Sequence, residues 1–135
     1  MNLVVLHLGS NKGEKSKNIL SAYDLIEERI GHITKKSSLH HTKAWGIESQ
    51  DDFLNSALIV ETDLGPFEVL TISNQIEKDL GRKKTEKWGP RIIDIDIIFY
   101  NNLVLKSSML TIPHPFYHLR EFVISPLKEL DILVD

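Results

Sequence analysis

The sequence predicts an α+β fold of the ferredoxin-like class, in which helices pack on an antiparallel sheet built in the order β-α-β-β-α-β. Short apolar runs that suit strands alternate with two segments whose apolar residues recur at helical spacing. Glycine, asparagine and proline separate these segments and favour turns between them. The 135 residues suffice for one domain with a proper core, and we expect residues 1–135 to form it.

The first half of the chain predicts a strand, a helix and another strand. Residues 3–8 form an apolar run that suits a central strand, and the turn-forming residues 9–13 (GSNKG) follow it. From Ser16 onward isoleucine and tyrosine recur at helical spacing, and Gly31 suits the end of that helix. Residues 33–42 are polar and β-branched, which suits a strand with one solvated side.

The second half predicts a loop, a strand, a helix, a basic loop and a last strand, followed by a C-terminal extension that contains several prolines. Pro66 suits the first turn of the helix and Gly81 its end. Within the extension, we expect residues 127–130 to pack on the surface. In chain order the elements fall at residues 45–52, 53–62, 64–81, 82–89, 92–100 and 101–135.

The composition excludes several classes of function. The chain has no cysteine, so it has no disulfide, no thiolate nucleophile and no cysteine-type zinc site. It has no apolar stretch long enough to span a bilayer, and its N-terminus lacks the pattern of a signal peptide. A formal net charge of −3 gives no general attraction to nucleic acid or anionic lipid. We therefore expect a cytoplasmic protein that binds neither nucleic acid nor membranes.

Residues 88–97 (WGPRIIDIDI) are the most informative segment of the chain. Asp94 and Asp96 lie in an otherwise apolar run, and residues two apart in a strand point to the same face. Burying one carboxylate is costly unless something pairs with it, and a second beside it raises the cost. A divalent cation that bridges the two aspartates would remove this cost.

Five cations lie within ten residues of the chain just before these aspartates. They could simply neutralise the carboxylates, since structural ion-pair networks are common. The alternative is a nucleoside triphosphate site, where magnesium binds one or two protein carboxylates and phosphate oxygens, and arginines stabilise the phosphate charge. The charges alone leave both interpretations open. The cations are Arg82, Lys83, Lys84, Lys87 and Arg91.

A second pair of candidate residues lies on the earlier strand. Phe53 and Asn55 share a face by the two-residue period, so a ring and an amide project together. A ring face suits stacking, and an amide offers donors and an acceptor to the edge of a heterocycle. The alternative is that Phe53 belongs to the core and Asn55 only lies at a strand end.

Six motifs, spread over nearly the whole chain, follow the order and spacing of one enzyme family. Through them the sequence resembles the 6-hydroxymethyl-7,8-dihydropterin pyrophosphokinases, which transfer the terminal diphosphate of ATP to a pterin alcohol in folate biosynthesis. The WGPR-x-x-D-x-D segment is the most specific of the six. The motifs are residues 9–11 (GSN), 53–57 (FLNSA), 81–82 (GR), 88–97 (WGPRIIDIDI), 112–115 (IPHP) and 120–123 (REFV).

The resemblance implies two magnesium ions that bracket the triphosphate, with ATP as co-substrate. Asp94 and Asp96 match the metal ligands. The residues that match catalytic positions are Arg82, Trp88, Arg91, Asp94 and Asp96. Those that match ATP contacts are Glu77, Lys84, Trp88, Arg91, Ile97, Thr111, His114 and Arg120. Those that match pterin contacts are Thr42, Lys43, Trp45, Phe53, Asn55, Trp88, Asp94 and Phe122.

The chain also departs from the family pattern. Lys83 and Lys84 follow Arg82 where the family often has a second arginine, so a bidentate phosphate contact would become a point-charge contact. Met109 stands where some members carry a nucleotide-contacting arginine, and Pro115 where some carry tyrosine. We expect a monomer that binds ATP and the pterin, and a weak dimer is the alternative.

Two other classes of protein fit parts of the pattern. An RNA-binding module shares the element order, but the first strand has no aromatic residue and the net charge is negative. A metal-dependent nuclease or nucleotidyltransferase would use the same two aspartates. Release of AMP from ATP would separate the pyrophosphokinase from this second class.

Overall fold

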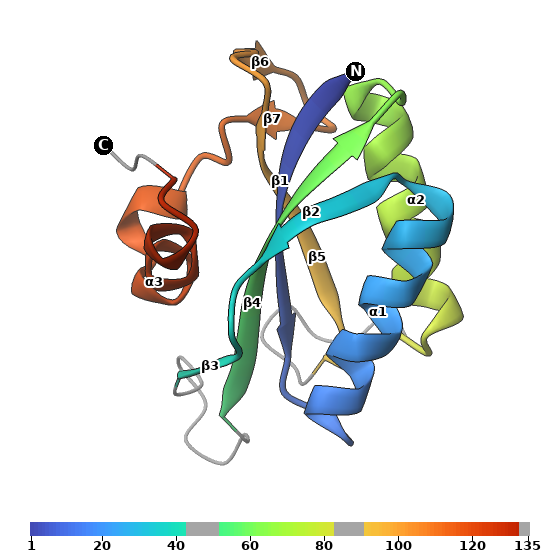
Figure 1. Cartoon of the computed structure of the whole chain (residues 1–135), viewed down its shortest axis with the longest axis vertical. Helices are drawn as coiled ribbons and strands as arrows, with labels where there is room; N and C mark the ends of the chain where they lie inside the picture. The colour runs from blue at the N-terminus through green and yellow to red at the C-terminus, as the bar shows by residue number, and fades with distance from the viewer. Residues whose placement is uncertain (43–51, 83–90, 133–135) are drawn as a thin grey trace.

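The computed structural model describes residues 1–42, 52–82 and 91–132, which form a main antiparallel sheet, a small two-stranded sheet and helices on both faces of the main sheet (Figure 1). The strands are β1 (Asn2–Ser10), β2 (His32–Lys36), β3 (His40–Thr42), β4 (Phe53–Thr62), β5 (Asp94–Tyr100), β6 (Leu105–Lys106) and β7 (Thr111–Ile112). The helices are α1 (Lys15–Arg29), α2 (Pro66–Asp79), the 3-10 turn η1 (Tyr117–Leu119) and α3 (Glu121–Glu129).

The strand order of the main sheet confirms the predicted fold class. The order is β2-β4-β1-β5, with β3 also paired to β4, and every pairing is antiparallel. The helices α1 and α2 cover one face, as the ferredoxin-like class requires, while α3 lies against the other (Figure 1). Within the described parts of the chain, no helix is long and apolar enough to cross a membrane.

The larger core lies between the sheet and the pair α1 and α2. Alternate residues of β1, namely Val4, Leu6 and Leu8, are fully buried there. The helices contribute side chains at the predicted helical spacing, among them Ile26 and Ile76, which are also fully buried. The two-residue period of β1 therefore places Val4, Leu6 and Leu8 on the helix face, and directs Val5, His7 and Gly9 to the other face.

A second, smaller core lies on the opposite face, under α3. Leu127 is fully buried there and Leu130 is 8% exposed, and they pack with Val5, Ala57 and Ile98 of the sheet. The expectation that residues 127–130 pack on the surface is therefore wrong. The helix was not predicted because it is short and contains Pro126, which usually interrupts a helix.

Two strand boundaries also differ from the prediction. β1 continues to Ser10, because Gly9 and Ser10 still pair with Asn55 and Leu54 of β4. The single strand expected at residues 33–42 is divided into β2 and β3, because residues 37–39 belong to neither strand, although both strands pair antiparallel with β4. Gly81 has a φ of +102° at the end of α2, which confirms its predicted role there.

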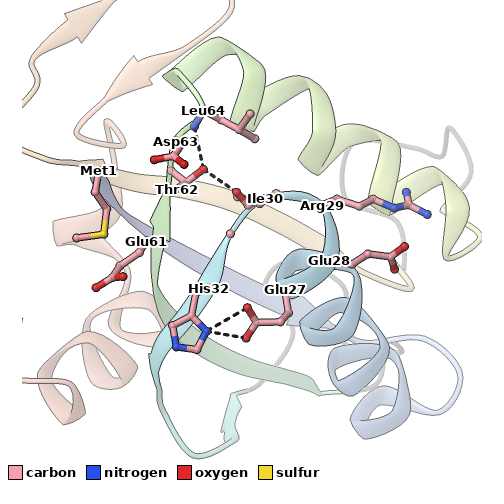
Figure 2. A pocket seen from close by; sticks show the side chains of 11 residues that line it. Met1, Glu27, Glu28, Arg29, Ile30, His32, Glu61, Thr62, Asp63 and Leu64 are labelled. Atoms are coloured by element: carbon pink, nitrogen blue, oxygen red, sulfur yellow. Dashed lines mark hydrogen bonds and ion pairs between the residues drawn. The ribbon is translucent and has the colours of Figure 1, made fainter.

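The connection from α1 to β2 requires a glycine for steric reasons. A Cβ atom at Gly31 would lie 2.0 Å from the backbone oxygen of Glu61 on β4. The adjacent Thr62 hydroxyl donates to the Ile30 carbonyl at 2.6 Å and accepts from the Leu64 N–H at 3.1 Å. Figure 2 shows these bonds beside a surface hollow of about 400 Å³. This hollow lies at the opposite end of β1 from Ser10, because Thr62 pairs with Asn2.

We predict that Gly31→Ala lowers the free energy of unfolding by about 3 kcal/mol or more, because backbone must move to admit the methyl group. Urea denaturation measures this loss. Gly65→Ala is the control, since its Cβ would lie 3.5 Å from the Glu68 Oε1, and we expect it to cost less than about 1 kcal/mol. Equal losses in the two variants would contradict the steric argument.

Candidate active site

The candidate site begins with a row of three residues across the centre of the sheet. Gly9 of β1 pairs with Asn55 of β4 on one side and with Asp94 of β5 on the other. The next row on this face pairs His7 with Ala57 and Asp96 in the same way. Both rows lie on the face away from α1 and α2. The predicted common face of the two aspartates is therefore confirmed.

Gly9 leaves open the space between the amide and the carboxylate. A Cβ atom at this position would lie 3.3 Å from the Asn55 Oδ1 and 3.6 Å from the Phe53 ring. Phe53 and Asn55 thus point to the same face, as their spacing predicted. Asn55 is buried, and its Nδ2 donates to the Thr42 hydroxyl of β3 at 2.8 Å, which fixes the orientation of the amide.

Two arginines contact Asp94, and one of them also contacts α2. The Arg82 Nη1 lies 2.8 Å from the Asp94 Oδ1 and 2.8 Å from the Glu77 Oε2. The Arg91 Nη1 lies 3.3 Å from both oxygens of Asp94. In this structure the arginines therefore do neutralise the carboxylate. The same guanidinium groups lie where they could meet the phosphates of a bound nucleotide.

Glu77 is the buried acid behind these arginines. Its side chain accepts a hydrogen bond from the Ile95 backbone N–H at 2.8 Å, which ties the end of α2 to β5. Burial raises the pKa of Glu77 to about 7, although the Ile95 hydrogen bond and the Arg82 charge oppose the rise. Glu77 thus holds Arg82 beside Asp94. The sequence led us to expect Glu77 as a nucleotide contact and did not indicate this positioning role.

Asp96 offers carboxylate oxygens as metal ligands, and neighbouring positive charges compensate its negative charge only in part. Burial, followed by the nearby Asp94 charge, raises the pKa of Asp96 to about 6, although three arginines lower it. A divalent cation beside the two carboxylates would stabilise the ionised form. Among the described residues no group of three or more metal-ligating side chains occurs.

Asn11 was expected to belong only to a turn, but it positions Arg91. The Asn11 Oδ1 accepts from the Arg91 backbone N–H at 2.7 Å, and the Asn11 N–H donates to the Arg91 carbonyl at 3.0 Å. Asn11 is 2% exposed. The sequence signal for a role of Asn11 was its place in the glycine-serine-asparagine motif. Spacing alone could not identify Arg91 as its partner, because the two residues lie far apart in the chain.

The segment before α3 and its first turn form the other wall of the site. The Arg120 guanidinium lies 5.8 Å from the ring centres of both Phe116 and Phe122, a cation–π arrangement. His114 precedes this segment, and burial, followed by the Arg120 charge, lowers its pKa. Arg120 therefore brings positive charge near Asp96 from this side, with two aromatic rings beside it.

His7 is a further residue of this wall that sequence reasoning missed. It is 3% exposed, and its Nε2 lies 3.1 Å from the Phe122 carbonyl oxygen. Burial lowers the pKa of His7 to about 4, although the Phe122 hydrogen bond opposes the shift. His7 was missed because it stands within an apolar strand and outside the motif at residues 9–11.

The remaining predicted residues divide into three groups. The Ile97 side chain is buried in the larger core, so only its backbone remains for a contact with the nucleotide. Thr111 lies on β7, whose partner is β6 rather than the main sheet. The predictions for Lys43, Trp45, Lys84 and Trp88 lie outside the described residues.

Comparisons with known proteins point to one family. The profile of the 7,8-dihydro-6-hydroxymethylpterin-pyrophosphokinase family matches residues 5–132. The chain is 44% identical to a 2-amino-4-hydroxy-6-hydroxymethyldihydropteridine pyrophosphokinase of Aquifex aeolicus, over 97% of this chain and 81% of that one. It is 38% identical to the protein of the same name in Bacillus subtilis, over 96% of this chain and 78% of the relative.

A solved structure described as HPPK-DHPS in complex with substrates shares the fold. It has a TM-score of 0.78 and 16% sequence identity, over 96% of this chain. The match spans 40% of that longer chain.

We predict that the stability of the protein depends on pH through His7. The folded state keeps the imidazole neutral down to about pH 4, whereas an unfolded histidine binds a proton below about pH 6.5. The stabilising contribution is therefore complete above pH 6.5 and is lost as the pH falls toward 4. Between pH 7 and pH 5 the wild type should lose about 2 kcal/mol more unfolding free energy than His7→Gln. Urea denaturation at both pH values measures the difference, and parallel losses in the two proteins would contradict it.

Proposed function

The chain belongs to the 7,8-dihydro-6-hydroxymethylpterin pyrophosphokinase family, and on this basis we propose how its own residues perform the reaction. It is an ATP-dependent transferase that moves a pyrophosphoryl group from ATP to hydroxymethyldihydropterin in folate biosynthesis. We assign the metal, the nucleotide and the pterin to separate parts of the site. The observation that carries the assignment is the row formed by Asn55, Gly9 and Asp94.

Asp94 and Asp96 hold two magnesium ions in this proposal. The pair fits such ions because both groups are carboxylates on one face and burial raises the pKa of Asp96. Bound magnesium would neutralise phosphate oxygens and lower the pKa of the attacking alcohol. Magnesium brings positive charge and the phosphates bring negative charge. In the substrate complex the aspartates can therefore pair with the metal in place of the arginines, and the arginines can pair with the phosphates in place of the aspartates.

The nucleotide binds beside β5, where positive side chains are available for its phosphates. Arg82 and Arg91 lie within hydrogen-bond or ion-pair distance of Asp94. If magnesium held a phosphate beside this carboxylate, either guanidinium could rotate to contact that phosphate. Arg120 and His114 approach from the side of α3. To this group we also assign Glu77, Lys84, Trp88, Ile97 and Thr111, with Glu77 acting through Arg82.

The pterin binds on the other side of the row, between β4 and α3. Asn55 presents its amide to the edge of the heterocycle, while Phe53 and Phe122 provide ring faces for stacking. The bond from Asn55 to Thr42 supports this assignment, because it leaves the amide oxygen directed toward Gly9. Around the pterin we also place Lys43, Trp45, Trp88 and Asp94.

The reaction is an in-line displacement at the β-phosphorus of ATP. The pterin hydroxymethyl oxygen forms a bond to this phosphorus, the bond to the oxygen that joins the α- and β-phosphates breaks, and AMP leaves. We assign no side chain as general base. Arg82 and Arg91 stabilise the negative charge that develops on the leaving oxygen, so positioning and charge stabilisation supply most of the catalysis.

We also propose the setting in which the enzyme works. Residues 1–135 act as one pyrophosphokinase domain, as a monomer in the cytoplasm, with no nucleic-acid or membrane partner. The net charge of −3 supports the absence of a polyanionic partner. An assay with ATP and hydroxymethyldihydropterin tests the function, since AMP must appear in step with the pyrophosphorylated pterin.

We predict that Asp94→Asn and Asp96→Asn each lower kcat by about 10²-fold or more, because the metal loses a carboxylate ligand. AMP formation is followed by chromatography over a magnesium titration. Both variants should remain folded, because asparagine keeps the shape of the side chain and removes one charge from a like-charged pair, which offsets the ion pairs with Arg82 and Arg91 that Asp94→Asn loses. Asp63→Asn is the control, since Asp63 is exposed beside the distant surface hollow. Near-normal magnesium-dependent AMP release from either site variant would refute the metal assignment.

A further inference from the structure

Pro126 alters the hydrogen bonding of α3 at the residue that forms the proposed pterin wall. In a regular α-helix the N–H of residue 126 donates to the carbonyl of residue 122. Proline has no N–H, so this bond is missing from α3 although Pro126 lies within the helix. The Phe122 carbonyl instead receives a bond from the His7 Nε2 at 3.1 Å. Because a carbonyl only accepts, the His7 Nε2 carries the proton.

His7 contacts Phe122 through its ring as well as through this bond. The two ring centres are 5.9 Å apart with an interplanar angle of 58°. His7 also lies between Ala57 and Asp96 in the register, one row from Gly9 and the candidate substrate space. One side chain on the central strand therefore holds both the backbone and the ring of Phe122.

An ordinary core position does not account for this histidine. Burying an imidazole loses its hydration, and a side chain such as leucine would fill the same space without that loss. The hydrogen bond to Phe122 compensates the loss and is specific in direction. Since the Nε2 proton is used in this bond, His7 does not act as a base through that atom.

We propose that His7 is a positioning residue for the pterin substrate, which it serves by donating to the Phe122 carbonyl that Pro126 leaves without its helical donor. This proposal rests on the proposed function, in which Phe122 stacks on the pterin. His7 fixes the height and tilt of the Phe122 ring over the sheet face. The hydrogen bond and the ring contact described for His7 both go to Phe122, so we expect its removal to affect pterin binding more than ATP binding.

The first experiment removes the donor and then restores it from the helix. His7→Phe keeps an aromatic ring but has no donor, and we expect it to raise the KM for hydroxymethyldihydropterin about tenfold. The KM for ATP should change by less than about twofold, and kcat should fall less than the pterin KM rises. His7→Gln keeps a donor and should have a pterin KM close to that of the wild type.

Adding Pro126→Ala supplies the backbone N–H that proline lacks. In the double variant His7→Phe/Pro126→Ala, the helix itself can donate to the Phe122 carbonyl. We expect the pterin KM of the double variant to return to within about threefold of the wild type. A role of His7 in core packing alone predicts no such recovery, because the second substitution removes further buried volume.

Thr62→Val is the matched control at the far end of the sheet. The Thr62 hydroxyl is also buried and also donates to a carbonyl, that of Ile30 at the end of α1 (Figure 2). Its loss should lower the melting temperature but leave both KM values unchanged. If His7→Phe does not fold, His7→Leu serves the same comparison with a smaller side chain.

The outcomes separate failure of this proposal from failure of the pterin assignment. A Phe122→Ala variant with a normal pterin KM would reject Phe122 as a pterin wall, and the His7 proposal with it. If Phe122→Ala raises the pterin KM while His7→Phe leaves it unchanged, only the His7 proposal is overturned. Failure of Pro126→Ala to restore the pterin KM of His7→Phe would also overturn it.

Discussion

The pairing of β1 with β4 on one side and β5 on the other is the constraint on which the rest of the structure depends. It places Asn55, Gly9 and Asp94 side by side on one face, and it directs Leu6 and Leu8 to the other. Because strand residues alternate between faces, a slip of one residue would bury the acids under α1 and α2 and expose the core. The larger core and the candidate site therefore both require the same register of β1 with β4 and β5.

Under the proposed function, the two interpretations that the charges left open describe two states of one site. In this structure Arg82 and Arg91 neutralise Asp94, and Glu77 holds Arg82 in place. Burial keeps the charge of Asp96 costly, which favours the approach of a cation. The ion pairs of this network keep Arg82, Arg91 and Asp94 neutralised in this structure, and the proposed magnesium–triphosphate complex would use the same groups.

The sequence predicted those features that depend on local periodicity and turn chemistry. The shared face of Asp94 and Asp96, that of Phe53 and Asn55, and the end of α2 at Gly81 all follow from spacing or from the conformational freedom of glycine. These properties need no knowledge of a distant partner. The missed features depend instead on contacts between segments far apart in the chain. Asn11 and His7 have partners at Arg91 and Phe122, and Pro126 masked α3, since proline inside a short amphipathic segment ordinarily argues against a helix.

The central position of β1 has a consequence for the order in which the chain can assemble during synthesis. Its first strand, β1, must wait for β4, which ends at Thr62, and for β5, which ends at Tyr100, before both of its edges are paired. Such long-range pairing slows folding, because loop closure precedes the stabilising contacts. The acids of β5 therefore reach their place beside Gly9 and His7 only after β5 has been synthesised, and α3 adds the final wall. The binding face is therefore complete only once α3 (Glu121–Glu129) has docked on the sheet.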